Sequence, residues 1–119
     1  MLKRKIEKKI YDWIRNDERA LLLYGVRQAG KTYIIRHCLE SKGCSYVEFN
    51  LIREPDIVAI LKNATDVDDL ILKLSLYSDK KIIPGETFLF FDEIQKYKEI
   101  VTKIKFLVED RRYRYILSG

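Results

Sequence analysis

The segment from Gly25 to Thr32 reads GVRQAGKT and decides the fold prediction. It matches the pattern G-x-x-x-x-G-K-[ST] without a departure, and this pattern is typical of a loop that binds phosphate groups. The glycines let the backbone curl so that successive N–H groups point inward, and the helix that follows adds partial positive charge at its N-terminus. The residues predicted to bind the phosphates of a nucleotide are Gly25, Arg27, Gln28, Ala29, Gly30, Lys31 and Thr32.

Several residues of this loop have distinct predicted roles. We expect Lys31 to reach along the β- and γ-phosphates as a mobile point charge, and the Thr32 hydroxyl to serve as a hard oxygen ligand for Mg²⁺. Arg27 lies at the crown of the loop, where it contacts phosphate, contacts a neighbouring subunit, or is an exposed structural arginine. A side chain at Gly30 would obstruct the phosphate. The loop therefore predicts a nucleoside triphosphate and Mg²⁺ as the bound cofactors.

The segments that flank the loop are those that a phosphate site requires. Residues 20–24 form an apolar run that is too short for a helix and is suited to a buried parallel strand. Residues 31–41 have apolar side chains at helical spacing, and Gly43 supplies the left-handed residue that commonly ends a helix. This strand–loop–helix context separates a phosphate site from a glycine turn that fits the pattern by chance.

Strands and helices are predicted to alternate along the rest of the chain. Residues 1–15 form a helix with one apolar stripe and lysines opposite, and Trp13 belongs to the core. The other predicted elements are strands over 45–50, 87–91 and 113–117 and helices over 55–62, from Asp66 onward and over 94–108. Such alternation requires right-handed crossovers and a parallel sheet. The predicted fold class is therefore α/β, as one nucleotide-binding domain over residues 1–119.

Two adjacent carboxylates, Asp92 and Glu93, follow the apolar run 88–91. In an open α/β sheet, ligands bind where the strands end at their carboxyl termini. We expect Asp92 to hold Mg²⁺, mostly through water, and Glu93 to orient and deprotonate the water that attacks the γ-phosphorus. The alternative for Glu93 is a cap on the helix beginning near Ile94, where a negative charge is favoured. A general base is needed for hydrolysis and not for phosphate binding, so the pair favours hydrolysis.

Composition limits the other functions that the chain can have. Of the 119 residues, 47% are hydrophobic and 34% are charged, as in a globular protein. No apolar run approaches the ~20 residues that cross a bilayer, and the N-terminus lacks the features of a secretory signal, so we expect a cytoplasmic location and no membrane partner. Cys38 and Cys44 fit no metal-ligand pattern and are interpreted as reduced thiols. His37 is expected on a helix surface.

The net charge of +5 would suit a polyanionic partner. Much of it lies in the first nine residues, where a basic run is either the solvated face of an amphipathic helix, which we favour, or a nucleic-acid contact. Residues 111–115 interleave arginine and tyrosine, as proteins that bind single-stranded nucleic acid do. The same residues fit a buried β-strand, and packing is the favoured interpretation.

Together, the two motifs GVRQAGKT and LFFDEIQ resemble those of the AAA+ superfamily, in particular a group of prokaryotic ATPases. The resemblance covers nearly the whole chain and implies ATP binding with Mg²⁺-dependent hydrolysis. It also implies that the strand after the acidic pair lies between the two motif-bearing strands and ends in a polar residue that contacts the γ-phosphate or attacking water. Ser118 occupies that position. The predicted catalytic residues are Glu93, Lys31 and Ser118.

The superfamily pattern continues beyond Gly119 with a fifth strand, a helical lid and an arginine finger. We expect a chain without these parts to bind nucleotide with weak or absent turnover, because an arginine supplied in trans is worth about 10³ to 10⁵ in rate. The strand before the phosphate loop would then have an open edge, a surface for self-association or for a protein partner.

Two other functions remain open from the sequence. The first is a non-enzymatic module in which nucleotide binding orders a surface for a partner. The second is a small kinase that transfers the γ-phosphoryl group to a metabolite, although the adjacent Asp92 and Glu93 argue against it.

Overall fold

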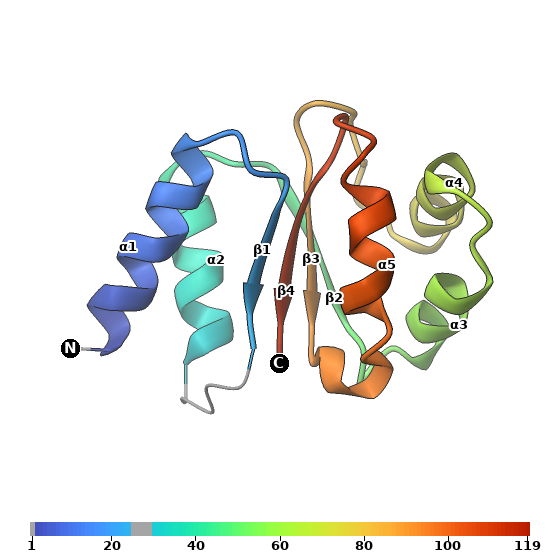
Figure 1. Cartoon of the computed structure of the whole chain (residues 1–119), viewed down its shortest axis with the longest axis horizontal. Helices are drawn as coiled ribbons and strands as arrows, with labels where there is room; N and C mark the ends of the chain where they lie inside the picture. Colours follow the sequence, from blue (N-terminus) through green and yellow to red (C-terminus); the bar gives the residue numbers. More distant parts are fainter. Residues whose placement is uncertain (1, 25–29) are drawn as a thin grey trace.

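A computed structural model describes residues 2–24 and 30–119 and shows a parallel sheet between two layers of helices (Figure 1). Its elements, in chain order, are α1 (Leu2–Arg15), β1 (Ala20–Leu23), α2 (Lys31–Ser41), β2 (Tyr46–Asn50), α3 (Pro55–Asn63), α4 (Val67–Tyr77), β3 (Phe88–Asp92), the 3₁₀ helix η1 (Ile94–Tyr97), α5 (Ile100–Leu107) and β4 (Arg114–Ser118). The predicted α/β class with a parallel sheet is therefore confirmed.

The strand order in the described residues is β1-β4-β3-β2, and every neighbouring pair is parallel. The last strand in the sequence therefore lies between β1 and β3, as the superfamily resemblance implies. Leu23 of β1 is paired with Ser118, and Phe91 of β3 is paired with Leu117. This order brings the carboxyl ends of the strands that carry the two motifs to one edge of the sheet, with β4 between them. Within the described residues β1 is an edge strand, as predicted.

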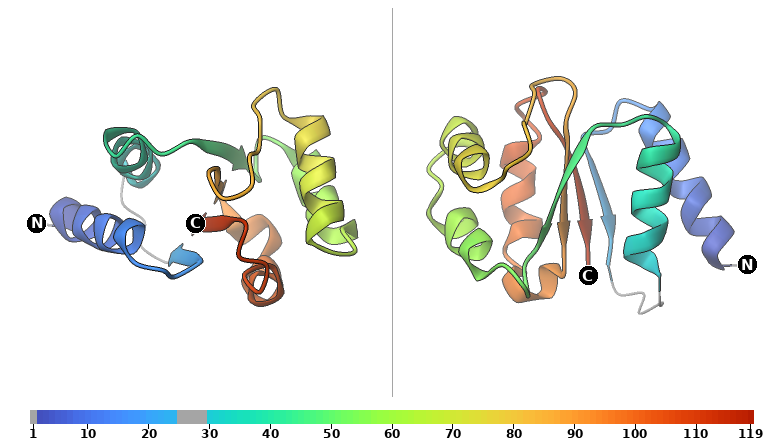
Figure 2. Two further views of the ribbon diagram at one scale, coloured as in Figure 1. Left: turned by 90° about the horizontal axis from the view of Figure 1, so that it is seen from above. Right: turned by 180° about the vertical axis from the view of Figure 1, so that it is seen from behind.

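Alternate residues of the central strands feed two separate cores (Figure 2). Phe90 and Ile116 face α1 and α2, where they pack among fully or nearly buried apolar residues. Leu89 and Phe91 face α3, α4 and α5 on the other side. Strands that are buried on both faces read as continuous apolar runs, as residues 89–91 and 115–117 of the two central strands do.

The ends of α2 and α4 follow from local chemistry. Gly43 has φ +67°, and two backbone hydrogen bonds, Gly43 N to Glu40 O (3.1 Å) and Cys44 N to Leu39 O (2.9 Å), close the end of α2. This is the Schellman arrangement, which needs a left-handed residue at that place. At the start of α4, the Asp66 side chain accepts a hydrogen bond from Asp69 N at 2.8 Å, so the predicted N-cap is confirmed.

The structure differs from the sequence prediction between residues 94 and 108. A single helix was predicted there, whereas the chain forms η1 and then α5. The preceding Glu93 has φ 60° and ψ 44°, so the chain leaves β3 through a left-handed residue and a tight 3₁₀ turn before α5 begins. Strands β3 and β4 each end one residue later than predicted, at Asp92 and Ser118.

Arg114, at the start of β4, connects the end of α1 to the sheet. Its guanidinium lies over the rings of Trp13 and Phe88, at 4.3 Å and 5.1 Å from their centroids. It also donates hydrogen bonds to carbonyl groups at the end of α1 and just beyond it; of these, the Trp13 carbonyl also accepts a hydrogen bond from Asn16 N at 3.2 Å. The acceptors are the carbonyl oxygens of Trp13 (2.5 Å), Ile14 (3.0 Å), Asn16 (3.2 Å) and Glu18 (3.1 Å). The basic and aromatic run around Arg114 therefore serves packing, as favoured from the sequence.

Replacing this arginine tests its structural role. We expect Arg114→Ala to lower the free energy of unfolding by about 2–4 kcal/mol, because four carbonyl groups, two of them in partly buried hydrogen bonds, lose a charged donor and two rings lose their contact. Arg111→Ala is the matched control, since the ion pair of Arg111 with Asp17 is exposed and worth about 0–1 kcal/mol. Urea unfolding of both variants measures the difference, and equal losses would contradict the assignment.

Candidate functional site

The residues predicted from the two motifs meet at the carboxyl edge of the sheet. Asp92 ends β3, Ser118 ends β4, and α2 begins at Lys31 on the same edge. Gly30 precedes α2 with φ +92°, a conformation that side chains rarely adopt, in agreement with the glycine that the motif requires there. The remaining predicted phosphate contacts, Gly25, Arg27, Gln28 and Ala29, lie outside the described residues and stay predictions.

A short hydrogen bond joins the two motifs. The Thr32 hydroxyl donates to Asp92 Oδ2 at 2.6 Å, although these residues are 60 positions apart in the sequence. Asp92 is only 4% exposed, and its other carboxylate oxygen accepts a hydrogen bond from the Glu93 N–H at 2.9 Å. A hydroxyl and a carboxylate at this separation are two hard oxygen donors of the kind that Mg²⁺ prefers. The donor set therefore fits the predicted metal.

Lys31 is held inside the site, with 9% of its surface exposed. Its ammonium donates a hydrogen bond to the Gly119 carbonyl oxygen at 2.6 Å, at the end of β4. Burial lowers the pKa of Lys31 from its usual value, while the carboxylates of Asp92 and Glu93 act in the opposite direction by favouring the charged form. The Lys31 ammonium thus lies close to the carboxylates of Asp92 and Glu93 at this edge of the sheet.

Glu93 has an uncommon backbone conformation. It is the one non-glycine residue with positive φ among the residues that the structure describes. It occupies the N-cap position of η1, as the capping alternative expects, but its side chain makes no capping hydrogen bond there. Backbone strain of this kind costs of order 1–3 kcal/mol and is often found at functional sites. Here it turns the chain sharply just after Asp92, at the carboxyl edge of the sheet.

Ser118 is fully buried, and its hydroxyl has no hydrogen-bond partner among the described residues. Buried hydroxyls are nearly always paired, so an orphan at a strand end is consistent with a missing ligand. The next residue, Gly119, is one that the sequence analysis did not single out. A Cβ on Gly119 would lie 2.8 Å from Gln95 Oε1 and 3.1 Å from Ile94 N, so glycine permits β4 to approach the turn that follows Glu93.

Other chemically active side chains lie apart from this edge or are committed to packing. His37 is exposed on α2 and stacks on Tyr33, with ring centroids 6.3 Å apart. Cys38 and Cys44 are free thiols, as predicted. Across residues 2–24 and 30–119, histidine, cysteine and acidic side chains form no group of three or more that could hold a metal ion. Trp13 is 2% exposed and belongs to the core, also as predicted.

Comparison with known proteins places this geometry in a family. A search of curated proteins gave no match. A family model described as an AAA domain matches residues 17–119, which include both motifs and every strand of the described sheet. Membership of this family indicates a nucleotide-binding function of the ATPase type. The chain therefore belongs to the AAA domain family.

Proposed function

We propose that the chain binds Mg·ATP at the carboxyl edge of its sheet and hydrolyses it. The observation that carries this proposal is the 2.6 Å hydrogen bond between the Thr32 hydroxyl and Asp92, next to the buried Lys31. Groups suited to phosphate, to a metal and to a water molecule thus lie at one edge of the sheet. They are the Lys31 ammonium, the oxygen atoms of Thr32 and Asp92, and the Glu93 carboxylate. The description of the matching family as an AAA domain supports ATP as the nucleotide.

Each residue has a separate task in this proposal. Lys31 neutralises the β- and γ-phosphates once its ammonium leaves the Gly119 carbonyl, and Gly30 leaves space for them. Thr32 and Asp92 hold Mg²⁺, Asp92 mostly through water; when bound, the metal neutralises charge that develops on the phosphate oxygens. Both positions need a rigid support, which the end of β3 and the first turn of α2 provide.

Glu93 and Ser118 serve the reaction rather than binding. The Glu93 carboxylate orients a water molecule and removes its proton as the water oxygen bonds to the γ-phosphorus. The bond from the γ-phosphorus to the bridging oxygen of the β-phosphate breaks in the same step, and ADP leaves. The Ser118 hydroxyl, which has no hydrogen-bond partner among residues 2–24 and 30–119, donates to the γ-phosphate or holds that water. This hydrogen bond accelerates the reaction to the extent that it is stronger in the transition state than with bound ATP.

Replacing Glu93 separates hydrolysis from binding. We expect Glu93→Gln to bind Mg·ATP as the parent chain does and to lower single-turnover phosphate release by about 10²–10⁴-fold, because an amide cannot accept the proton. Glu99→Gln is the control with the same charge change, at an exposed position. Single-turnover conditions allow slow chemistry to be measured even if full turnover needs an arginine from a partner.

The outcomes separate the rival functions. Unchanged chemistry in Glu93→Gln would remove Glu93 from the role of base. Binding without any phosphate release in the parent chain would favour a nucleotide-gated interaction module. A strong preference for a hydroxyl acceptor over water would identify a kinase.

Ser118→Ala tests the orphaned hydroxyl. Removing a buried, unpaired hydroxyl takes nothing from the folded state, so we expect the free energy of unfolding to stay within about 0.5 kcal/mol or to rise. We expect phosphate release to fall by about tenfold or more. Thr87→Ala is the comparison for stability, because the buried Thr87 hydroxyl accepts a hydrogen bond from Ile83 N at 2.8 Å. A destabilised Ser118→Ala with normal activity would show that the hydroxyl is structural.

A further inference from the structure

The positive charge of the chain is concentrated in α1. This helix carries six basic and two acidic side chains, a net charge of +4, against +5 for the whole chain. It precedes the part of the chain that matches the AAA domain model, which begins at residue 17. The remaining residues are therefore close to neutral, and α1 is a basic element that is packed onto a nearly neutral domain.

The acidic side chains of α1 leave most of its cations unpaired. Asp12 is engaged with both Lys8 and Arg15. Among the described residues, the exposed basic side chains of α1 without an ion pair are Lys3, Arg4, Lys5 and Lys9. Two of them, Lys5 and Lys9, are one helical turn apart, so they project from the same side of α1.

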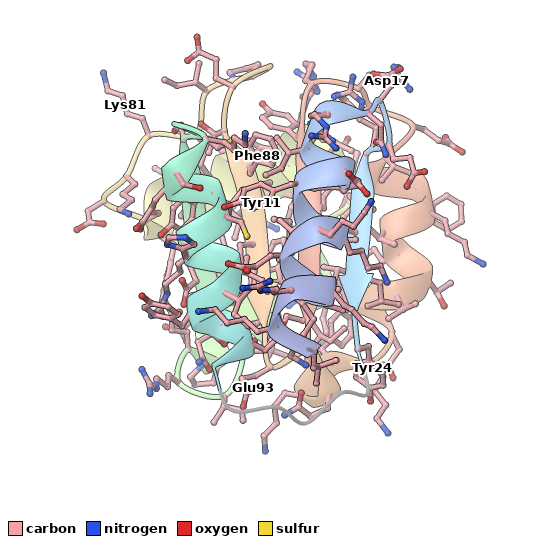
Figure 3. All side chains as sticks on the ribbon, turned by 90° about the vertical axis from the view of Figure 1, so that its left-hand side faces the viewer. Tyr11, Asp17, Tyr24, Lys81, Phe88 and Glu93 are labelled. Atoms are coloured by element: carbon pink, nitrogen blue, oxygen red, sulfur yellow. The ribbon has the colours of Figure 1, made fainter. Side chains whose placement is uncertain are left out.

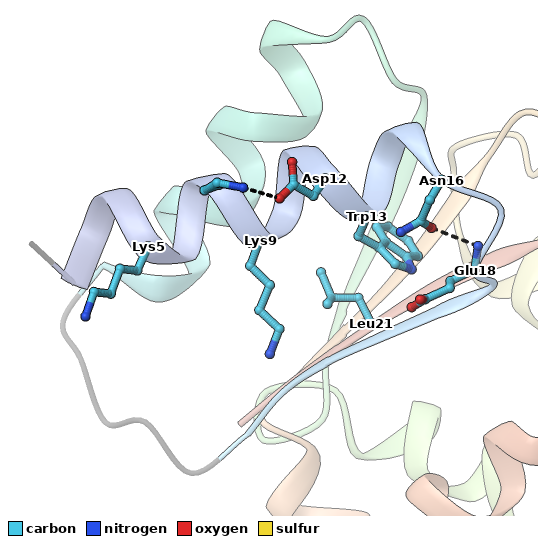
Figure 4. Close-up of a pocket in the computed structure, with 8 residues that line it drawn as sticks. Lys5, Lys9, Asp12, Trp13, Asn16, Glu18 and Leu21 are labelled. Carbon is cyan, nitrogen blue, oxygen red and sulfur yellow. Dashed lines mark hydrogen bonds and ion pairs between the residues drawn. The ribbon is translucent and has the colours of Figure 1, made fainter.

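These lysines line a groove of about 410 Å³ between α1 and β1 (Figure 4). Trp13 and Leu21 form its apolar wall, and Asp12 and Glu18 also contribute to the lining. The lining therefore carries three lysines, Lys5, Lys8 and Lys9, against two carboxylates, and Asp12 is already paired with Lys8 and Arg15. A net positive charge remains in the groove, which suits an anionic group.

The apolar stripe of α1 is already used for packing. Ile6, Ile10 and Trp13 are buried against the sheet and α2, and Tyr11 contacts Ser41 of α2 through a 2.8 Å hydrogen bond (Figure 3). A helix that lies in a membrane interface needs such a stripe free to enter the lipid. The outward face of α1 presents cationic side chains but no apolar stripe that could enter a lipid bilayer. This favours a polyanion in water over a lipid surface as the partner.

We propose that the outward face of α1, with Lys5 and Lys9 at its centre, binds the phosphodiester backbone of nucleic acid. Cationic side chains on successive turns of one helix suit a polymer that carries one negative charge on each nucleotide. The contact is independent of base sequence, because lysine and arginine reach phosphates as charges and read no base edges here. This surface is separate from Lys31 and the acidic pair, so it does not depend on the proposed ATPase activity.

Binding of fluorescently labelled single-stranded and duplex DNA, followed by anisotropy without ATP, tests the proposal. We expect the logarithm of the affinity to fall with the logarithm of salt concentration between about 50 and 200 mM. For four neutralised phosphates the slope should be about −2.8 on single-stranded DNA and about −3.6 on duplex DNA. Lys5→Glu/Lys9→Glu is expected to weaken binding by roughly tenfold or more at low salt and to reduce the slope by about 2.

The matched control is Lys98→Glu/Lys105→Glu, which changes the net charge equally at exposed positions in the η1–α5 segment, across the sheet from α1. We expect it to stay within about threefold of the parent chain, since only distant charges change. Lys5→Gln/Lys9→Gln, with circular dichroism as a check of folding, separates lost contacts from repulsion. Lys31→Ala should bind DNA normally, so a failure of the ATP proposal would leave this result unaffected.

Three outcomes would overturn the proposal. The first is no DNA binding by the folded chain at the lowest salt concentration. The second is equal weakening in the α1 variant and the control, which would mean that net charge alone drives binding. The third is binding to anionic phosphatidylserine vesicles without binding to DNA, which would assign α1 to a membrane surface.

Discussion

The hydrogen bond between Thr32 and Asp92 is the contact on which the site depends. It joins the first turn of α2 to the end of β3, two elements that come from distant parts of the chain. The contact requires β4 to lie between β1 and β3 at the correct register, because a shift of one residue would turn Asp92 to the other face. The fold can therefore be understood as a support that brings one hydroxyl and one carboxylate together.

The packed interior of the sheet stabilises the fold, whereas its carboxyl edge carries a strained backbone and a buried unpaired group that cost free energy. Leu89, Phe90, Tyr115 and Ile116 are fully buried in the two central strands, where they feed the two cores. The strained Glu93 directly follows β3, and β4 ends in Ser118, whose hydroxyl has no hydrogen-bond partner among the described residues. Such features persist only where the surrounding structure holds them, and they are found preferentially where ligands bind. The central strands thus provide the packing energy that a strained edge needs.

No helix in residues 2–24 and 30–119 is long and apolar enough to cross a bilayer.

Much of this fold could be predicted from the sequence because its signals are strong and local. The apolar runs of the strands, the GKT motif and the Asp66 cap each determine structure within a few residues. The break between η1 and α5 could not be predicted, because the apolar stripe continues through it and the cause is the backbone conformation of Glu93. Two contacts of Gly119 could not be predicted either, because they arise only when β4 inserts between β1 and β3. They are its contact with Lys31 and its close approach to Ile94.

Calorimetric titration of the chain and its Lys31→Ala variant with Mg·ATP tests the central claim most directly. The account predicts saturable binding at one site, weakened in the variant by at least about 30-fold, the equivalent of about 2 kcal/mol for the loss of a buried charge contact. A folded chain that binds no Mg·ATP, or a variant that binds it as tightly as the parent, would contradict the assignment of this edge as the nucleotide site.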